Sequence, residues 1–303
     1  MADNITNDTN CLDDKVISHV LTAAYSFILI GGVTGITMMS YIVFQSNTRS
    51  VTTTAVINLI VVHGIFLLTV PFRILYYIRN EWVLGDDFCK FVSAMIHVHM
   101  YLSFIFYVTT LVIRYLIFFK RKDKLEFYRK LHAVAASTTV WVLILVIIFP
   151  LFFIQYGNNG KYDSSKCFQF QGEFMKLEVK VVNYIVIGTV LAVVCAFLCM
   201  QIYIIVGIVR KLQGPGACPP RILAQMKSLF FILVMVFSFM PYHIFRIYYI
   251  QNANDCRIVE YNEICLSLTA ASCFDMWSFV IQSNLFKQSA CTALKNKLGC
   301  CCL

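Results

Sequence analysis

Ionisable side chains inside long apolar segments are the residues of this chain whose chemistry most needs an explanation. His63 and Asp275 each stand in such a segment, and so do Arg73 and Arg246. If these segments cross a bilayer, a lone carboxylate near its centre costs about 2.5 to 3.5 kcal/mol, so Asp275 needs a partner or a water-filled cavity. Buried guanidinium groups usually meet anions. These residue types therefore predict ion pairing and anion binding.

Motifs for catalysis or metal binding are absent from the sequence. It contains no HExxH or GxSxG motif, and the acidic doublet Asp86-Asp87 is expected in an exposed loop. Cys300 to Cys302 are adjacent, and His97 and His99 project about 200° apart on a helix, so neither group has the spacing of a zinc site. The sequence therefore predicts no enzyme, no cofactor and no metal site.

The composition indicates that these residues belong to a membrane protein. Of the 303 residues, 59% are hydrophobic and only 14% are charged, and the mean hydropathy is +0.72. A soluble domain would have too little polar surface to cover such a core. Continuous apolar runs of about 20 residues indicate spanning helices and argue against the short alternating strands of a β-barrel. We expect seven helices, at Ser18–Phe44, Thr52–Tyr77, Phe88–Phe119, Ala133–Ile154, Val179–Ile208, Ile222–Ile250 and Tyr261–Ile281.

The charge distribution predicts the orientation of this all-α bundle. Lysine and arginine concentrate beside alternate loops, and most acidic residues lie beside the others, which places the N-terminus on the side away from the cytoplasm. The sequons at Asn4 and Asn7 agree, because N-glycosylation occurs on the lumenal side. We expect an extracellular segment of residues 1–17 without a cleaved signal peptide, one membrane domain of residues 18–282, and a cytoplasmic segment of residues 283–303. The net charge of +9 then favours anionic lipid and a cytosolic partner over nucleic acid.

Cysteines are expected in two different roles. Four would face the oxidising side of the membrane, and we expect them to pair as Cys89–Cys167 and Cys11–Cys256, with free thiols as the alternative. The terminal Cys300, Cys301 and Cys302 follow a basic segment and indicate palmitoylation beside a short amphipathic helix.

Several strings in register along the chain resemble the rhodopsin-like G-protein-coupled receptors, in the pattern of their nucleotide-receptor branch. The resemblance covers nearly the whole chain and implies a seven-helix receptor with a short membrane-parallel eighth helix and a heterotrimeric G protein as partner. It also implies that Pro241 kinks the sixth helix and that Phe239 acts as a packing switch. The matching residues are Asn58-Leu59, the run Leu67 to Arg73, Trp82 to Gly85 before Cys89, Arg114-Tyr115, Trp141, Pro150, Tyr203 and the run Ser238 to His243.

The chain departs from the family pattern at positions that bear on signalling. His63 replaces an aspartate around which resembling receptors build a sodium site. We therefore expect a His63–Asp275 ion pair or hydrogen bond there, with a neutral histidine donating to a carbonyl as the alternative. Ile113 replaces the acid that restrains the arginine corresponding to Arg114, which predicts raised basal signalling unless Asp123 or another group substitutes for it.

The resemblance also implies where a ligand binds. Six side chains should line an outer pocket for an anionic small molecule, such as a nucleotide or an acidic lipid, and the ligand would swing the sixth helix outward at Pro241. That movement would open a crevice for the G protein beside Arg114, Tyr115 and Tyr203. The alternative for the arginines is pairing with Glu260 or Glu263 at the outer interface. The alternatives for the protein are a non-signalling scaffold that modulates another receptor as a dimer and, remotely, a transporter. The six pocket residues are Arg73, Tyr76, Tyr101, Tyr242, His243 and Arg246.

Overall fold

Helices form all the regular secondary structure in the part of the chain that the structure describes. This computed structural model describes residues 14–45, 51–119, 135, 137–144, 146, 165–168, 176–212, 219–252 and 255–280. Residues 137–143 and 275–280 are also helical. The labelled elements are α1 (Asp14–Gln45), α2 (Val51–Arg79), α3 (Asp86–Phe119), α6 (Leu177–Leu212), α7 (Pro219–Gln251), α8 (Cys256–Ala270) and the 3-10 helix η3 (Ala271–Phe274).

Five of these helices are long and apolar enough to cross a membrane: α1, α2, α3, α6 and α7. Turn residues delimit them. Asn80, directly after α2, takes the left-handed conformation (φ 53°), and its N–H donates to the Tyr76 carbonyl oxygen at 2.7 Å, which is a common way to end a helix. Asp86 and Asp87 do not lie in a loop as predicted. They form the exposed first turn of α3, where carboxylates interact favourably with the positive end of the helix dipole.

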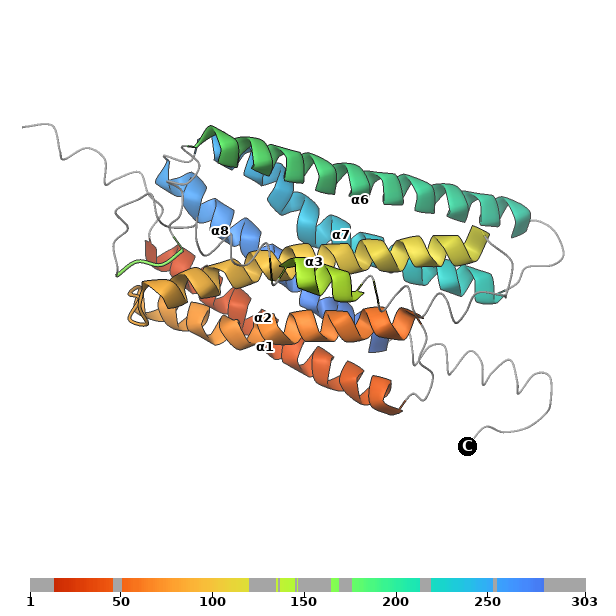
Figure 1. Ribbon diagram of the computed structural model, residues 1–303, viewed down its shortest axis with the longest axis horizontal. Coiled ribbons are helices and arrows are strands. Elements are labelled where there is room, and N and C mark those ends of the chain that lie inside the picture. Colours follow the sequence, from red (N-terminus) through yellow and green to blue (C-terminus); the bar gives the residue numbers. More distant parts are fainter. Residues whose placement is uncertain are drawn as a thin grey trace, which may run out of the picture.

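The helices pack side by side into a closed bundle. Contacts join α1 to α2, α2 to α3, α6 to α7 and α7 to α8, and α1 also contacts α8 and η3. Figure 1 shows the long helices running in roughly one direction, with α1 and α6 at opposite edges of the view. Because α3 also contacts α7 and α8, side chains from α2, α3, α7 and the segment after α8 meet in the interior.

Polar and apolar residues are distributed as in a protein surrounded by lipid. Large apolar side chains are turned outward, and Phe44 and Leu68 are 87% and 74% exposed. The interior instead contains His63, Gln201 and Asp275, which are at most 1% exposed. A hydrocarbon solvent favours this arrangement, because apolar side chains face lipid and polar ones find partners inside.

Glycines allow α1 to approach the C-terminal part of the bundle closely. A Cβ atom on Gly31 would collide with the ring of Phe274, and one on Gly35 would lie 3.1 Å from the ring of Trp277. The indole N–H of Trp277 donates to the Gly31 carbonyl oxygen at 2.9 Å. Small residues four positions apart are a common device for close helix packing in membranes.

The seventh predicted helix is interrupted, and nothing in its sequence predicts the interruption. We expected one helix over Tyr261–Ile281, but η3 separates α8 from helical residues 275–280. The Asp275 N–H donates to the Ser272 carbonyl oxygen, three residues back, and the Tyr107 hydroxyl donates to the same oxygen at 3.3 Å. The Tyr107 hydroxyl on α3 therefore contacts the 3-10 turn that precedes Asp275.

Several expectations fall outside the described residues. They are most of the fourth helix, the sequons at Asn4 and Asn7, the Cys11–Cys256 pairing, the eighth helix and the cysteines Cys300 to Cys302.

Candidate functional site

The disulfide between Cys89 and Cys167 organises one end of the bundle, called the outer end here after the orientation expected from the sequence. It ties the first turns of α3 to the short described segment 165–168, whose Ser165 carbonyl oxygen accepts from the Trp82 N–H at 2.8 Å. Phe168 follows the disulfide in the left-handed region (φ 69°), a conformation that costs a non-glycine residue about 1 to 2 kcal/mol. This conformation places the Phe168 ring 4.2 Å from the guanidinium carbon of Arg73.

Arg73 is buried under Phe168 and only partly satisfied. It is 1% exposed, so it does not extend to the outer surface. Its Nη2 donates to the Val92 carbonyl oxygen at 3.1 Å, and its Nη1 donates to the Tyr25 hydroxyl at 3.4 Å. The Glu263 carboxylate lies 3.9 Å from Nη1, which is a loose ion pair. Nε has no hydrogen-bond partner among the described side chains, so the guanidinium fork retains donor capacity.

Arg246 is a second cationic side chain near Glu263. Its Nη1 donates to Asn262 Oδ1 at 3.1 Å, and its guanidinium carbon lies 4.8 Å from the ring centre of Tyr249 and 5.6 Å from that of Tyr242. Glu263 interacts electrostatically with both Arg246 and Arg73. One carboxylate therefore interacts with two cationic side chains, although Arg73 reaches it inside the bundle and not at the outer interface.

His243 and Tyr101 complete this outer group, and Tyr76 packs on the aromatic rings next to it. The His243 Nδ1–H donates to the Phe239 carbonyl oxygen at 2.8 Å, and its ring centre lies 6.4 Å from that of Tyr101. Tyr76 packs edge-on against the aromatic ring of Phe168, at 5.1 Å. Tyr76 therefore packs against Phe168, the ring that covers Arg73. The outer cluster is defined here as Arg73, Arg246, His243, Tyr101, Tyr242 and Glu263.

A second polar group occupies the middle of the bundle. His63 Nε2 lies 3.2 Å from Asp275 Oδ1, and both side chains are fully buried. The Tyr107 hydroxyl donates to the other carboxylate oxygen at 2.6 Å. On the far side of the His63 ring, Nδ1 lies 2.8 Å from His99 Nε2 and 3.6 Å from Cys273 Sγ. The structure therefore places His63 beside Asp275, as the sequence suggested. It adds three contacts that the sequence did not predict: Tyr107 to Asp275, and His99 and Cys273 to His63.

Aromatic rings connect the central group to α7. The ring of Phe239, two residues before Pro241, lies 5.9 Å from Phe104 and 6.1 Å from Tyr107. Phe231, two turns earlier on α7, lies 5.9 Å from Tyr107. Tyr107 therefore contacts α7 at two levels while its hydroxyl binds Asp275.

At the inner end of the bundle, Arg114 faces an aromatic ring. Its guanidinium carbon lies 4.6 Å from the ring centre of Phe231 on α7, and no described acidic side chain pairs with it. A cation–π contact of this kind is worth about 0.5 to 2 kcal/mol. A restraint between α3 and α7 is therefore present at this position without an ion pair.

Buried amides join three helices next to Arg114. The Tyr115 hydroxyl donates to Gln201 Oε1 at 2.7 Å, and Gln201 Nε2 donates to the backbone and side-chain oxygens of Gln225 at 3.0 and 3.2 Å. Neither glutamine was predicted, although an amide inside an apolar helix is the signal that could have found them. Here Tyr203 does not line the crevice as expected. It is 78% exposed, because it projects about 200° away from Gln201 on the same helix.

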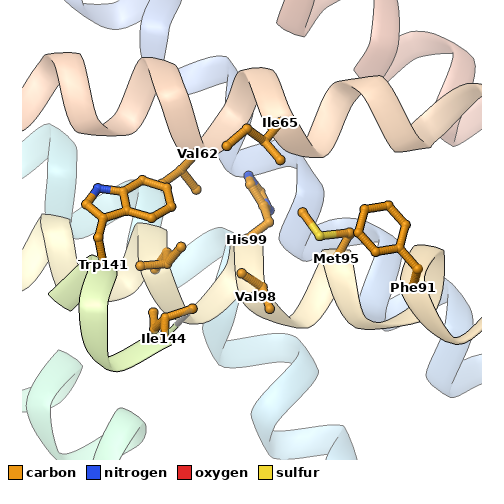
Figure 2. A pocket seen from close by; sticks show the side chains of 9 residues that line it. Val62, Ile65, Phe91, Met95, Val98, His99, Trp141 and Ile144 are labelled. Carbon is orange, nitrogen blue, oxygen red and sulfur yellow. The ribbon is translucent and has the colours of Figure 1, made fainter. Parts of the chain in front are cut away.

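A cavity of about 160 Å³ lies between α2, α3 and helical residues 141–144. Figure 2 shows His99 and Trp141 among the side chains that line it. The other lining residues are apolar, so this space suits neither a charged ligand nor a polar one.

A closed bundle of membrane-length helices, with ionisable groups inside and apolar side chains outside, defines a multi-pass membrane protein. Residues 35–275 match the family described as 7 transmembrane receptor (rhodopsin family), and the chain belongs to this family. It is therefore a seven-helix plasma-membrane receptor and not an enzyme.

Relatives from several mammals agree with this assignment. The Probable G-protein coupled receptor 141 of Homo sapiens is 48% identical over 291 residues, covering 94% of this chain and 95% of that protein. The 2-oxoglutarate receptor 1 of Rattus norvegicus is 25% identical, covering 97% of this chain and 90% of that protein. The Probable G-protein coupled receptor 34 of Pan troglodytes is 26% identical, covering 95% and 79%.

Proposed function

We propose that this receptor binds an anionic small molecule at the outer cluster and transmits the signal to a heterotrimeric G protein. The observation that supports the ligand class is Arg73. It is a buried guanidinium with one ordinary and one long hydrogen bond, a loose ion pair and an unpartnered Nε. A ligand carboxylate or phosphate would supply the bidentate acceptor that this fork lacks. The name of the 2-oxoglutarate receptor, a dicarboxylate receptor, supports the same class.

The outer cluster has the parts that anion recognition needs. Arg73 and Arg246 both interact electrostatically with Glu263, so a ligand anion would compete with this carboxylate for both guanidinium groups. Tyr101 and Tyr242 supply aromatic surface for an apolar or ring-containing part of the ligand. Both a nucleotide and an acidic lipid combine these two features.

Signal transmission would use the movement of α7. An anion bound by Arg246 and His243 would act on α7 just beyond Pro241, where the missing backbone N–H weakens the helix. Outward movement of the inner half of α7 would separate Phe231 from Arg114, and Gln225 from Gln201. Arg114 would then be available to a G-protein helix. The ligand would shift an existing equilibrium towards this open state.

The topology that this function requires is an extracellular N-terminus. The sequons at Asn4 and Asn7 would be glycosylated there, and Cys300 to Cys302 would attach the tail to the inner leaflet. Anionic lipid would face the basic inner surface. Because Arg114 has a ring contact and no described ion pair, we expect basal signalling above that of a relative with an acid at position 113. Dimer formation remains a separate prediction from the sequence.

The ligand class is tested with three probes on cells that express the receptor: 2-oxoglutarate, a nucleoside diphosphate and a lysophosphatidic acid. A probe that activates the wild type should need at least a tenfold higher concentration on Arg73→Gln, because a hydrogen bond to a charged group contributes about 1.5 to 3 kcal/mol. Arg79→Gln, at the exposed end of the same helix, is the matched control and should respond as the wild type. Equal potency on Arg73→Gln would refute the site.

Coupling is tested without any ligand. Second-messenger output is compared between the wild type and Arg114→Ala at matched surface levels. A basal signal that disappears in the variant supports coupling through Arg114. No signal from either protein, together with no response to the probes, favours the scaffold that modulates another receptor.

A further inference from the structure

The centre of the bundle contains three metal-binding side chains from three different helical segments. His63 on α2, His99 on α3 and Cys273 in η3 each offer one ligand atom, and these atoms all lie within 4.8 Å of one another. All three residues are buried. We propose that they bind one zinc ion, so that the earlier expectation of no metal site is replaced by a buried His2Cys centre.

The distances between the ligand atoms are close to those of a tetrahedral zinc site. With Zn–N of about 2.05 Å and Zn–S of about 2.3 Å, tetrahedral angles require about 3.6 Å from sulfur to nitrogen and about 3.3 Å between nitrogens. Cys273 Sγ lies 3.6 Å from His63 Nδ1 and 3.4 Å from His99 Nε2. The two nitrogens are 2.8 Å apart and must separate by about 0.5 Å.

The neighbourhood of His99 can accommodate that adjustment. Its ring stacks on Phe66 at 4.2 Å, and it also borders the apolar cavity of about 160 Å³ (Figure 2). The free volume beside the ring leaves room for a shift of about this size. Packing on all sides would have prevented this movement.

The second layer around the cluster has the arrangement that orients metal-binding histidines. A ligating histidine usually donates its other N–H to a carboxylate, which fixes the tautomer and makes the ligand atom more basic. His63 Nε2 lies 3.2 Å from Asp275 Oδ1, an ion-pair contact without hydrogen-bond alignment in this structure, and Asp275 is itself held by the Tyr107 hydroxyl at 2.6 Å. A small rotation would align the Nε2 proton with this carboxylate, and the lone pair of His63 Nδ1 would then face the cluster.

Charge balance favours a divalent ion in this position. When zinc binds, the Cys273 thiol loses its proton, and its thiolate and the Asp275 carboxylate together supply two negative charges. The two imidazoles stay neutral, with protons on Nε2 of His63 and Nδ1 of His99. The site then has no net charge, which greatly reduces the cost of placing ions at the centre of a bilayer. An imidazole–thiolate set also selects zinc over sodium, which prefers oxygen ligands.

Unsatisfied polar atoms around the cluster support a fourth ligand. The Ser103 hydroxyl, one turn from His99 on the same face of α3, has no hydrogen-bond partner among the described side chains. The same holds for Nδ1 of His99 and for the Ser272 hydroxyl. Buried polar atoms without partners often indicate a water or an ion. A water on the open position of zinc would supply some of these missing partners.

The experiment measures metal binding to the purified full-length receptor in lipid nanodiscs. Zinc affinity is determined by competition with a chromophoric indicator, and cobalt serves as a spectroscopic substitute for zinc. We expect one zinc per receptor, a rise in the midpoint of thermal unfolding with zinc, and a thiolate-to-cobalt charge-transfer band. The absence of the cobalt band, or of stoichiometric zinc in the wild type, overturns the proposal without any variant.

Matched pairs of variants locate the site. Cys273→Ser should lose the charge-transfer band and weaken zinc binding at least 100-fold, whereas Cys265→Ser on α8 should bind as the wild type. His99→Gln should weaken binding similarly, whereas His97→Gln, two residues away and outside the cluster, should not. Wild-type affinity in both Cys273→Ser and His99→Gln would place the metal elsewhere and refute the assignment.

Tyr107→Phe adds a test of the second layer. It removes the hydroxyl that holds Asp275 and leaves all three ligands in place, so zinc affinity should fall about 10-fold to 100-fold while the cobalt band is retained. An unchanged affinity would contradict the proposed role of Asp275. None of these readouts requires an agonist or a G protein, so the test is independent of the proposed signalling function.

Discussion

Gln201 offers the sharpest test of how the inner end of the bundle is held closed. Its side chain makes three hydrogen bonds, one to Tyr115 on α3 and two to Gln225 on α7, and it is fully buried. Gln201→Leu has a similar volume and removes all three. If the open state lacks these bonds, the change shifts the equilibrium towards opening and raises agonist-free signalling.

The size of the effect follows from the number of bonds. A typical buried hydrogen bond contributes about 0.5 to 1.5 kcal/mol net, so three bonds that differ between the states contribute about 1.5 to 4.5 kcal/mol. Each 1.4 kcal/mol changes an equilibrium about tenfold, which gives an increase of roughly 10-fold to 1,600-fold in the ratio of open to closed receptor. Tyr115→Phe removes one bond and should raise the same ratio about fivefold.

The assay is second-messenger output per surface receptor, at expression levels low enough that the response stays proportional. Tyr203→Phe is the matched control, because this tyrosine lies two residues from Gln201 and is 78% exposed. It should signal as the wild type. Basal output that stays the same or falls in Gln201→Leu, at equal surface levels, would show that these bonds do not distinguish the two states and would refute the reasoning.

Three further predictions concern stability, measured as thermal unfolding of the purified receptor. Gly31→Leu should unfold at a lower temperature than the wild type, because its side chain would collide with the ring of Phe274. Gly188→Ala has open space around it and should be neutral or gain up to about 1 kcal/mol of stability. Equal midpoints for the two variants would contradict the packing of Gly31. Tyr107→Phe should lose about 1.5 to 3 kcal/mol, because Asp275 loses a buried donor at 2.6 Å, and an unchanged midpoint would argue against that bond. Phe168→Gly should be more stable than Phe168→Ala by about 1 kcal/mol, because both variants lose the ring and only glycine adopts φ 69° without strain. The reverse order would show that the backbone at position 168 is not strained.

The helices themselves could be predicted because the sequence marks their limits directly. The segment expected at Thr52–Tyr77 is observed as α2, Val51–Arg79, and the one expected at Phe88–Phe119 as α3, Asp86–Phe119. Both are apolar runs bounded by charged or turn-forming residues. In a bilayer such a run forms a helix, because the helix satisfies every backbone hydrogen bond within the segment. The interruption at η3 carries no such mark, because it coincides with a contact from Tyr107, 165 residues away from Ser272.

The residues of the candidate sites also fall into two groups, those that the sequence could pair and those that only the fold brings together. His63 and Asp275 could be paired from the sequence, because each is an isolated polar residue in an apolar helix and each needs a partner. His99 and Cys273 could not be added to them, since 36 and 210 residues separate these side chains from His63. From the sequence, His99 could be considered only together with His97, two residues away on the same helix, and that pair does not have the spacing of a zinc site. Tyr203 was misplaced for a related reason, because a sequence match does not show which face of a helix is buried.

The position of Tyr107 suggests why the centre and the inner end of the bundle should respond together. Its hydroxyl binds Asp275, and its ring lies between Phe239 and Phe231 on α7, with Arg114 stacked on Phe231. Outward movement of α7 must therefore separate rings from Tyr107, whereas the pair of His63 and Asp275 lies off α7 and can persist. Spatial continuity alone does not establish energetic coupling. A double-mutant cycle between Tyr107→Phe and Phe231→Leu, read out as basal signalling, measures it, and effects that simply add would show that the hydroxyl and the ring act independently.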